Sequence, residues 1–360
     1  MARAAILAAV GAGLVLAGWL ALRPPEVPVE RSASVAAPTP VANQATAPAP
    51  LVPTQSSPTA PPPVIPIVRT ATPPAKATLY NDFLTAKSYR ALYDRLNGTA
   101  EGATPEGKFV LYELLRRCAE VTERDWKRPI SRPVTAKREE FLASLAPGDP
   151  NRERRIAAFE QVATNRCAGL EEISITHAEL NKMLAESAAA GDPKAKAHSL
   201  ELDLWASRRT DRKTTLTDDQ FDDLKQIAQT KDPEAILIAG RLMSNSWHEY
   251  ALRLVPDGPN VDPRAFHNAF LVLACDYGAP CGETNSRILQ ACAFQGHCDA
   301  GNLRDFLFYY GASPHDSELV TQYRTILRNA IESGDWSRLM IARGPLPSGA
   351  PRVFFGPNSR

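Results

Sequence analysis

The stretch that decides the fold is THAELNKMLAESAAAGDPKAKAHSL, residues 176–200. It begins with Thr176 and has Glu179 three residues later, a capping box in which both side chains satisfy free amides at a helix start. Asp192 and Pro193 mark a second helix, because Asp caps the first amides and Pro fits the first helical turn. The stretch therefore predicts two helices joined by a tight turn.

The same arrangement returns about 40 residues later, a period typical of helical repeats. TDDQFDDLKQIAQTKDPEAILIAGRL, residues 217–242, has a capping box at its start and an Asp-Pro pair at 232–233. Asp-Pro also occurs at 149–150 and 262–263, each time before a segment with helical apolar spacing. Long runs of alternating Val, Ile and aromatic residues, which would predict strands, are missing. The sequence predicts an all-α fold of stacked antiparallel helical hairpins.

The period and the Ala-rich segment at 188–205 resemble Sel1-like and tetratricopeptide-type repeats, most closely over residues 176–245. The resemblance is loose over 80–170 and 262–335, and the Gly-x-Gly turn of the Sel1 consensus is missing. It implies an α-solenoid of stacked hairpins. Families of this kind mostly hold partners together, so it also implies a scaffolding role, with no specific ligand.

The N-terminal part of this region also predicts helices. The segment at 78–98, TLYNDFLTAKSYRALYDRLNG, keeps apolar residues at helical spacing until Gly98, which indicates one helical run. Thr104 and Pro105 then mark the start of the next helix.

Residues 4–22, AAILAAVGAGLVLAGWLAL, carry no charge and follow Arg3. At 1.5 Å per residue they span about 28 Å, close to the ~30 Å hydrocarbon core of a bilayer. We interpret residues 1–23 as a single-pass anchor in a bacterial inner membrane, with the rest in the periplasm, because a short positive N-terminus stays inside. The alternative is a cleaved signal peptide and a soluble periplasmic protein, although no Ala-x-Ala site follows the run. Small residues at every fourth position would let two such helices self-associate.

Composition changes abruptly at 24–77, which hold 15 of the chain's 31 prolines. Such a segment buries too little apolar surface to offset chain entropy, so we expect a disordered linker. Residues 78–342 form the predicted disulfide-stapled helical repeat domain, and 343–360 an irregular tail in which 353–355 either dock on the domain or bind a partner. After the five basic and two acidic residues of the first 77 are set aside, 36 basic and 38 acidic residues remain. This balance offers no basic surface for nucleic acid.

An even number of cysteines in an exported chain favours disulfides. The six are Cys118, Cys167, Cys275, Cys281, Cys292 and Cys298. The last four form two Cys-x₅-Cys pairs, which match neither the Cys-x₂₋₄-Cys spacing of zinc sites nor the Cys-x-x-Cys of redox sites.

Helix geometry constrains which cysteines can pair. We expect one helix over 284–294, which separates Cys281 from Cys292 by roughly 15 Å, whereas disulfide Cα atoms lie within about 7 Å. Cys275–Cys281 and Cys292–Cys298 are therefore the predicted bonds, and the two remaining cysteines pair by elimination.

No catalytic, cofactor or metal residues are assigned, because the six histidines lack metal spacing and are expected to be surface or capping groups. Glu186 and Ser187 are similar to the Glu-Ser pair of lytic transglycosylases, but the downstream segment of that family is absent. The leading hypothesis is an envelope interaction scaffold that binds a protein or peptide. A peptidoglycan hydrolase and a structural protein without a dedicated ligand are the alternatives.

Overall fold

The computed structural model describes residues 78–123, 134–344 and 352–355, all within the unit Pro66–Arg360. The expected anchor and linker, and most of the expected tail, lie outside these residues. Within the described ranges, no helix combines the length and the apolar character needed to cross a bilayer.

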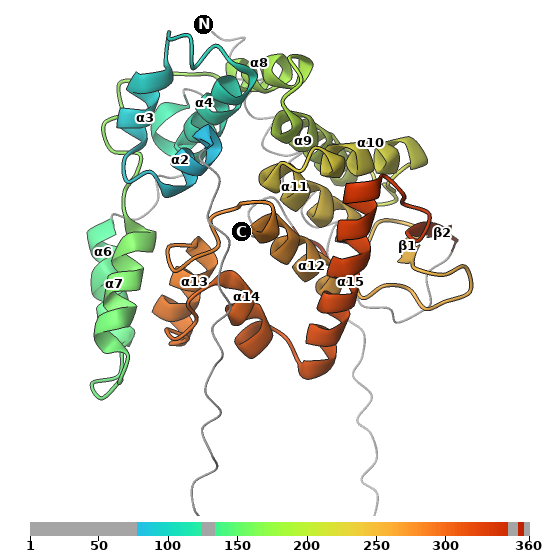
Figure 1. Ribbon diagram of the computed structural model, residues 1–360. Helices are drawn as coiled ribbons and strands as arrows, with labels where there is room; N and C mark the ends of the chain where they lie inside the picture. Colours follow the sequence, from blue (N-terminus) through green and yellow to red (C-terminus); the bar gives the residue numbers. More distant parts are fainter. Residues whose placement is uncertain (1–77, 124–133, 345–351, 356–360) are drawn as a thin grey trace, which may run out of the picture. The chain divides into compact units, whose positions relative to one another are not determined.

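Helices predominate in the described residues, as the sequence predicts (Figure 1). The helices are α2 Leu79–Thr85, α3 Tyr89–Leu96, α4 Pro105–Arg117, α5 Ala119–Thr122, α6 Val134–Ser144, α7 Arg152–Ala163, α8 His177–Ala189, α9 Pro193–Thr210, α10 Asp218–Gln229, α11 Pro233–Ser244, α12 Pro263–Asp276, α13 Ser286–Gln290, α14 Leu303–Phe306 and α15 Pro314–Ser333. Two π-helical segments, η1 Ala291–Gln295 and η2 Leu307–Gly311, continue α13 and α14. Two strands, β1 Tyr250–Arg253 and β2 Met340–Arg343, pair antiparallel.

Three of the four Asp-Pro pairs begin helices as predicted. The side chains of Asp192, Asp232 and Asp262 each accept a hydrogen bond from a first-turn amide, and Pro follows each of them. The prediction that Asp149 and Pro150 begin a helix is wrong, because the first residue of α7 is Arg152. There Asp149 accepts from the Asn151 amide and forms an ion pair with Arg155 at 2.5 Å, so its carboxylate is engaged before the helix begins.

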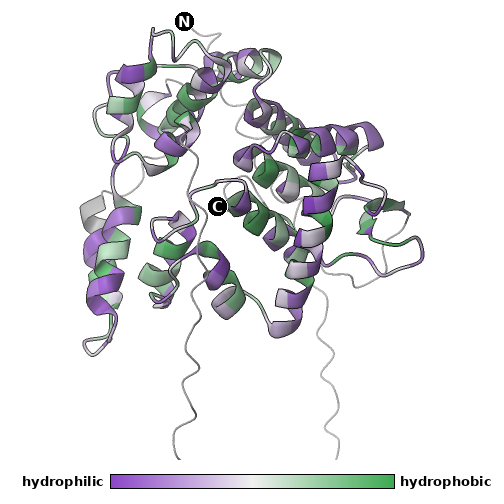
Figure 2. Ribbon diagram, viewed as in Figure 1, coloured by the Kyte–Doolittle hydropathy of each residue, from purple (hydrophilic) through white to green (hydrophobic). Residues whose placement is uncertain are grey.

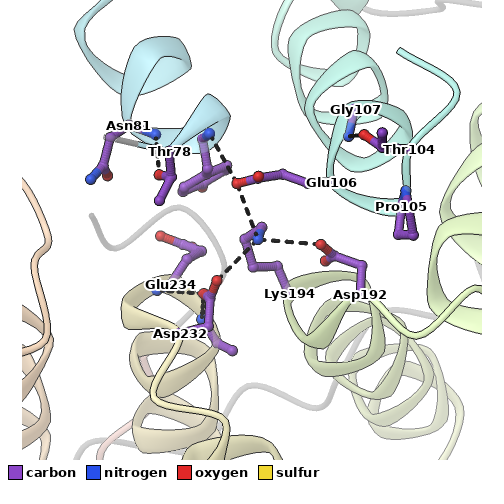
Figure 3. Close-up of polar contacts among 12 residues, drawn as sticks. Thr78, Asn81, Thr104, Pro105, Glu106, Gly107, Asp192, Lys194, Asp232 and Glu234 are labelled. Carbon is purple, nitrogen blue, oxygen red and sulfur yellow. Dashed lines mark hydrogen bonds and ion pairs between the residues drawn. The ribbon is translucent and has the colours of Figure 1, made fainter. Parts of the chain in front are cut away.

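Successive hairpins are joined by polar contacts that span 38 to 40 residues. Lys194 on α9 lies 3.2 Å from Asp192 and 3.0 Å from Asp232, the residue that caps α11 (Figure 3). Glu106 in the first turn of α4 approaches the same ammonium group at 3.5 Å. Burial lowers the pKa of Lys194, but the charges of Asp232, Asp192 and Glu106 outweigh it and raise that pKa overall. One buried cation thus connects the starts of α4, α9 and α11.

The run at 78–98 is two helices rather than one. Ala86 adopts extended backbone after α2, and the Tyr89 amide at the start of α3 donates to the carbonyl of Arg166. Arg166 also donates to the carbonyl of Leu84, 82 residues away in sequence. The apolar spacing continues across the break, so periodicity could not detect an interruption that a distant loop stabilises.

The main core lies along α9 to α12 and α15. Helix α12 is buried continuously from Ala265 to Cys275, and Figure 2 shows α11 and α12 as predominantly hydrophobic. A second core joins α2, α3, α4 and α8.

A third core departs from a simple linear repeat. Phe141 on α6 and Phe159 on α7 stack with ring centroids 4.2 Å apart, and both contact Phe294 in η1. Arg155 donates to the carbonyl of Ala293 at 2.8 Å, and Asn151 donates to the carbonyl of Gly296 at 3.3 Å. In a strict solenoid each repeat contacts its neighbours only. The α6–α7 hairpin instead packs on a segment more than 130 residues later.

Candidate functional site

The structure forms three disulfides with the pairing expected from the sequence. Cys118–Cys167, Cys275–Cys281 and Cys292–Cys298 have Cα–Cα distances of 5.5, 5.7 and 4.2 Å. Cys118 ends α4, and its bond to Cys167 closes the segment that contains α5, α6 and α7. Among the described residues, no cluster of His, Cys, Asp and Glu is arranged to hold a metal ion. The cysteine stretch is therefore a structural element of the domain.

The described residues surround a cavity of about 1,410 Å³. Its lining comes from α2 to α9, from α11 to α13, and from the start of α14. Small-molecule pockets typically measure about 300–1,000 Å³. The cavity is larger, and helices from widely separated parts of the sequence line it. It is the candidate functional site.

A chain of buried polar side chains lies at the wall of this cavity. Arg241 of α11 makes two hydrogen bonds of 2.7 Å to Glu201 of α9, and both side chains are almost fully buried. Glu201 Oε2 lies 3.2 Å from His198 Nδ1, and His198 Nε2 lies 3.0 Å from the Tyr112 hydroxyl. The buried network thus joins α4, α9 and α11, and its ends Tyr112 and Arg241 reach the cavity.

The pKa values in this network favour a structural role. Burial raises the pKa of Glu201, but the hydrogen bond from His198 and the charge and hydrogen bonds of Arg241 lower it overall to about 2. Glu201 is thus ionised, and it accepts a hydrogen bond from His198, whose other ring nitrogen lies against the Tyr112 hydroxyl. Burial and then the charge of Glu113 raise the pKa of Tyr112, which keeps its phenol protonated. A hydroxyl held neutral in this way is the opposite of an activated nucleophile.

The candidate general acid Glu186 has the wrong electrostatics for that role. Its carboxylate is exposed and pairs with Lys108 at 3.0 Å, which lowers its pKa. A general acid that acts near neutral pH needs a raised pKa. Ser187 is buried and donates to the carbonyl of Pro105 at 2.7 Å, which ties α8 to the start of α4. Both residues hold helices together.

His267 of α12 is a second buried group at the cavity wall. Its residue is 5% exposed, and neither ring nitrogen has a hydrogen-bond partner among the described residues. Burial lowers its pKa to about 3, with smaller contributions from the charges of Arg287 and Arg241. The ring of Phe355 stacks on it with centroids 4.0 Å apart. The expectation that the histidines are surface or capping groups is wrong for His267 and for His198, because distant helices and the tail cover them.

The neutral state of His267 predicts a pH dependence of stability. In the unfolded chain His267 binds a proton near pH 6.5, whereas in the folded chain it does so only near pH 3. The neutral ring therefore contributes fully to the free energy of unfolding above pH 6.5, and this contribution declines as the pH falls toward 3. At about 1.4 kcal/mol per pH unit, we expect a loss of about 3 kcal/mol between pH 7 and 4.5. Urea unfolding of His267→Phe, which keeps a ring against Phe355, should lack this component. An identical pH dependence in both proteins would contradict the assignment.

Part of the tail docks on the domain. Val353 exchanges hydrogen bonds with Ser246, and Phe355 exchanges them with the Asn245 side chain. Docking was one of the two expectations for residues 353–355, and the structure confirms it for these three residues. The sequence carried no signal for these partners, because the contacts join residues more than 100 positions apart.

The buried network was not expected from the sequence, although one signal was present. Glu201 and Arg241 occupy equivalent positions 40 residues apart, at the spacing of Asp192 and Asp232. Opposite charges 40 residues apart on buried helix faces could have indicated an ion pair between successive hairpins. Comparisons of the chain with models of protein families, with characterised proteins and with solved structures find no match.

Proposed function

We propose that this chain is an envelope interaction scaffold whose cavity binds an extended segment of a partner protein. The observation that carries the proposal is the cavity itself, which exceeds the size of small-molecule pockets and is lined by helices from both halves of the domain. Extended concave surfaces of stacked helix pairs are what helical-repeat proteins use to bind polypeptides.

The scaffold proposal includes the repeat architecture. The contact of Glu201 with Arg241 joins equivalent positions of successive hairpins, and the contact of Lys194 with Asp232 joins the starts of α9 and α11. Both support a Sel1-like or tetratricopeptide-like stack. The α6–α7 hairpin is then an insertion within that stack.

The proposal also includes the cellular location. Three disulfides are typical of an oxidising compartment. Together with the apolar run at 4–22 and the proline-rich linker, they support a domain held in the periplasm by an inner-membrane anchor. Cleavage of the run as a signal peptide would give the same domain in soluble form.

Site-specific photo-crosslinking in native membranes tests the scaffold proposal. Asn181 and Lys182 are neighbours on α8 and both are exposed, but only Asn181 lines the cavity. A photoreactive residue at Asn181 in the full chain should give a discrete adduct with an envelope protein, and the same residue at Lys182 should give at least about tenfold less. Equal adducts at both positions would mean that the cavity is not the binding surface.

A parallel assay addresses the hydrolase alternative. Purified full chain is incubated with peptidoglycan, and soluble muropeptides are measured. Release that persists without any Asn181 adduct would reverse the proposal in favour of an enzyme.

A further inference from the structure

The docked tail is recognised largely through its main chain. The Ser246 amide donates to the carbonyl of Val353 and its hydroxyl accepts from the Val353 amide, both at 2.9 Å. The Asn245 carboxamide accepts from the Phe355 amide at 2.6 Å and donates to the Phe355 carbonyl at 3.4 Å. Two side chains at the end of α11 therefore bind an extended segment as they would bind any peptide, without regard to its side chains.

Two aromatic contacts add side-chain selectivity. The guanidinium of Arg208 lies 3.6 Å from the ring centroid of Phe354, which also contacts Trp205 edge-on at 6.5 Å. Phe355 stacks on His267. A cation over a ring and a stacked ring pair each favour aromatic side chains at these two positions.

The tail is not part of the hydrophobic core. Val353, Phe354 and Phe355 are only half-buried, and Arg352 is exposed. Beneath them Asn245 is 2% exposed and His267 is 5% exposed. The tail thus covers polar groups that can hydrogen-bond to water when it leaves, which is the chemistry of a binding surface more than that of a packed interior.

The positive charge of Arg352 opposes docking of the tail beside Arg208. Burial lowers the pKa of Arg208, and the positive charge of Arg352 lowers it further. Like charges repel each other, so this pair opposes docking. A segment with an acidic residue in place of Arg352 would replace this repulsion with attraction.

We propose that Trp205, Arg208, Asn245, Ser246 and His267 form an acceptor site for an extended peptide with two consecutive aromatic residues. Residues 352–355 occupy the acceptor site in cis. A partner segment that carries an acidic residue, an aliphatic residue and then two aromatics displaces them. The acceptor site stands on the tail contacts alone, and so does not depend on partner binding in the cavity.

Fluorescence anisotropy with labelled peptides tests the acceptor site. The probes are Glu-Val-Phe-Phe-Gly and Arg-Val-Phe-Phe-Gly, and the receptor is the full chain. Phe354→Ala/Phe355→Ala removes the aromatic contacts of the tail, and Val353→Pro removes its amide donor. Both variants should bind the probes at least about tenfold more tightly than the wild type, because a tethered tail competes at an effective concentration near the millimolar range. The Glu probe should bind more tightly than the Arg probe, by a margin that decreases with added salt.

Two further variants test the roles of Asn245 and Arg352. Asn245→Ala added to the Phe354→Ala/Phe355→Ala variant should abolish probe binding while the thermal midpoint stays measurable. Arg352→Glu in the otherwise wild-type chain should strengthen docking in cis and reduce probe binding below the wild-type value. Equal probe binding to wild type and tail variants, survival of binding in Asn245→Ala, or a preference for the Arg probe would each overturn the proposal. If the tail variants fail to fold, Arg352→Glu still tests the proposal, because probe binding equal to that of the wild type would overturn it.

Discussion

Replacement of Arg241 by methionine should lower the free energy of unfolding by about 3–5 kcal/mol, the cost of leaving one member of a buried ion pair uncompensated. Arg241 neutralises Glu201 through two hydrogen bonds of 2.7 Å, and both side chains are almost fully buried. Without the guanidinium, burial raises the pKa of Glu201, and the carboxylate takes up a proton more readily. The loss relative to wild type should therefore be smaller at pH 5 than at pH 8.

Urea unfolding at both pH values measures this effect, and an exposed pair supplies the matched control. Arg95 and Glu101 lie 2.6 Å apart, but each side chain is 45% exposed. Arg95→Met should cost no more than about 1 kcal/mol, because solvent screens exposed pairs. The double variant Glu201→Leu/Arg241→Met should lose less than the sum of its single variants. Similar losses for Arg241→Met and Arg95→Met would show that the buried pair is not held as described.

Removal of the Cys118–Cys167 bond is expected to have an effect of comparable size. The two cysteines are 49 residues apart, and the chain-entropy relation gives about 4 kcal/mol for a loop of that length. The bond closes the segment that carries α6 and α7. Its loss therefore removes a covalent constraint on the hairpin that packs against η1.

The matched control is the short loop of Cys275–Cys281, whose separation of six residues predicts about 2 kcal/mol. Each pair is replaced by alanine in the full chain, and the free energy of unfolding is measured under oxidising conditions. Cys118→Ala/Cys167→Ala should lose clearly more than Cys275→Ala/Cys281→Ala. The reverse order would show that loop length does not govern these bonds.

The helix starts were predictable because their causes are local. Asp232 accepts from amides two and three residues away, and Thr176 and Glu179 form a reciprocal box within one turn. Groups so close in sequence meet in any fold that contains the helix. Asp149 shows the limit of this reasoning, since Arg155 competes for its carboxylate and α7 begins later.

The small sheet shows how tertiary contacts create elements that the sequence does not announce. Tyr250 to Arg253 pair with Met340 to Arg343, two four-residue segments separated by more than 80 positions. Neither segment carries the alternating pattern that would predict a strand. The pairing follows once α15 brings the second segment back to the end of α11, where its amides and carbonyls find partners.

The candidate site depends on distant contacts throughout. The cavity, the network from Tyr112 to Arg241 and the acceptor site each combine side chains from at least three separate elements. Apolar periodicity describes one helix at a time and does not specify which helices become neighbours.

By itself, the sequence determined the helical class, the starts of most hairpin helices and the disulfide pairing, because these follow from hydrogen bonds and bond lengths over a few residues or from elimination. The tertiary structure decided the break between α2 and α3, the packing of α7 on η1 and the docking of residues 352–355. It also decided which polar groups lose water. Burial and partners far along the chain make Glu201 a stable anion and His267 a neutral ring, and neither condition exists until the helices have packed.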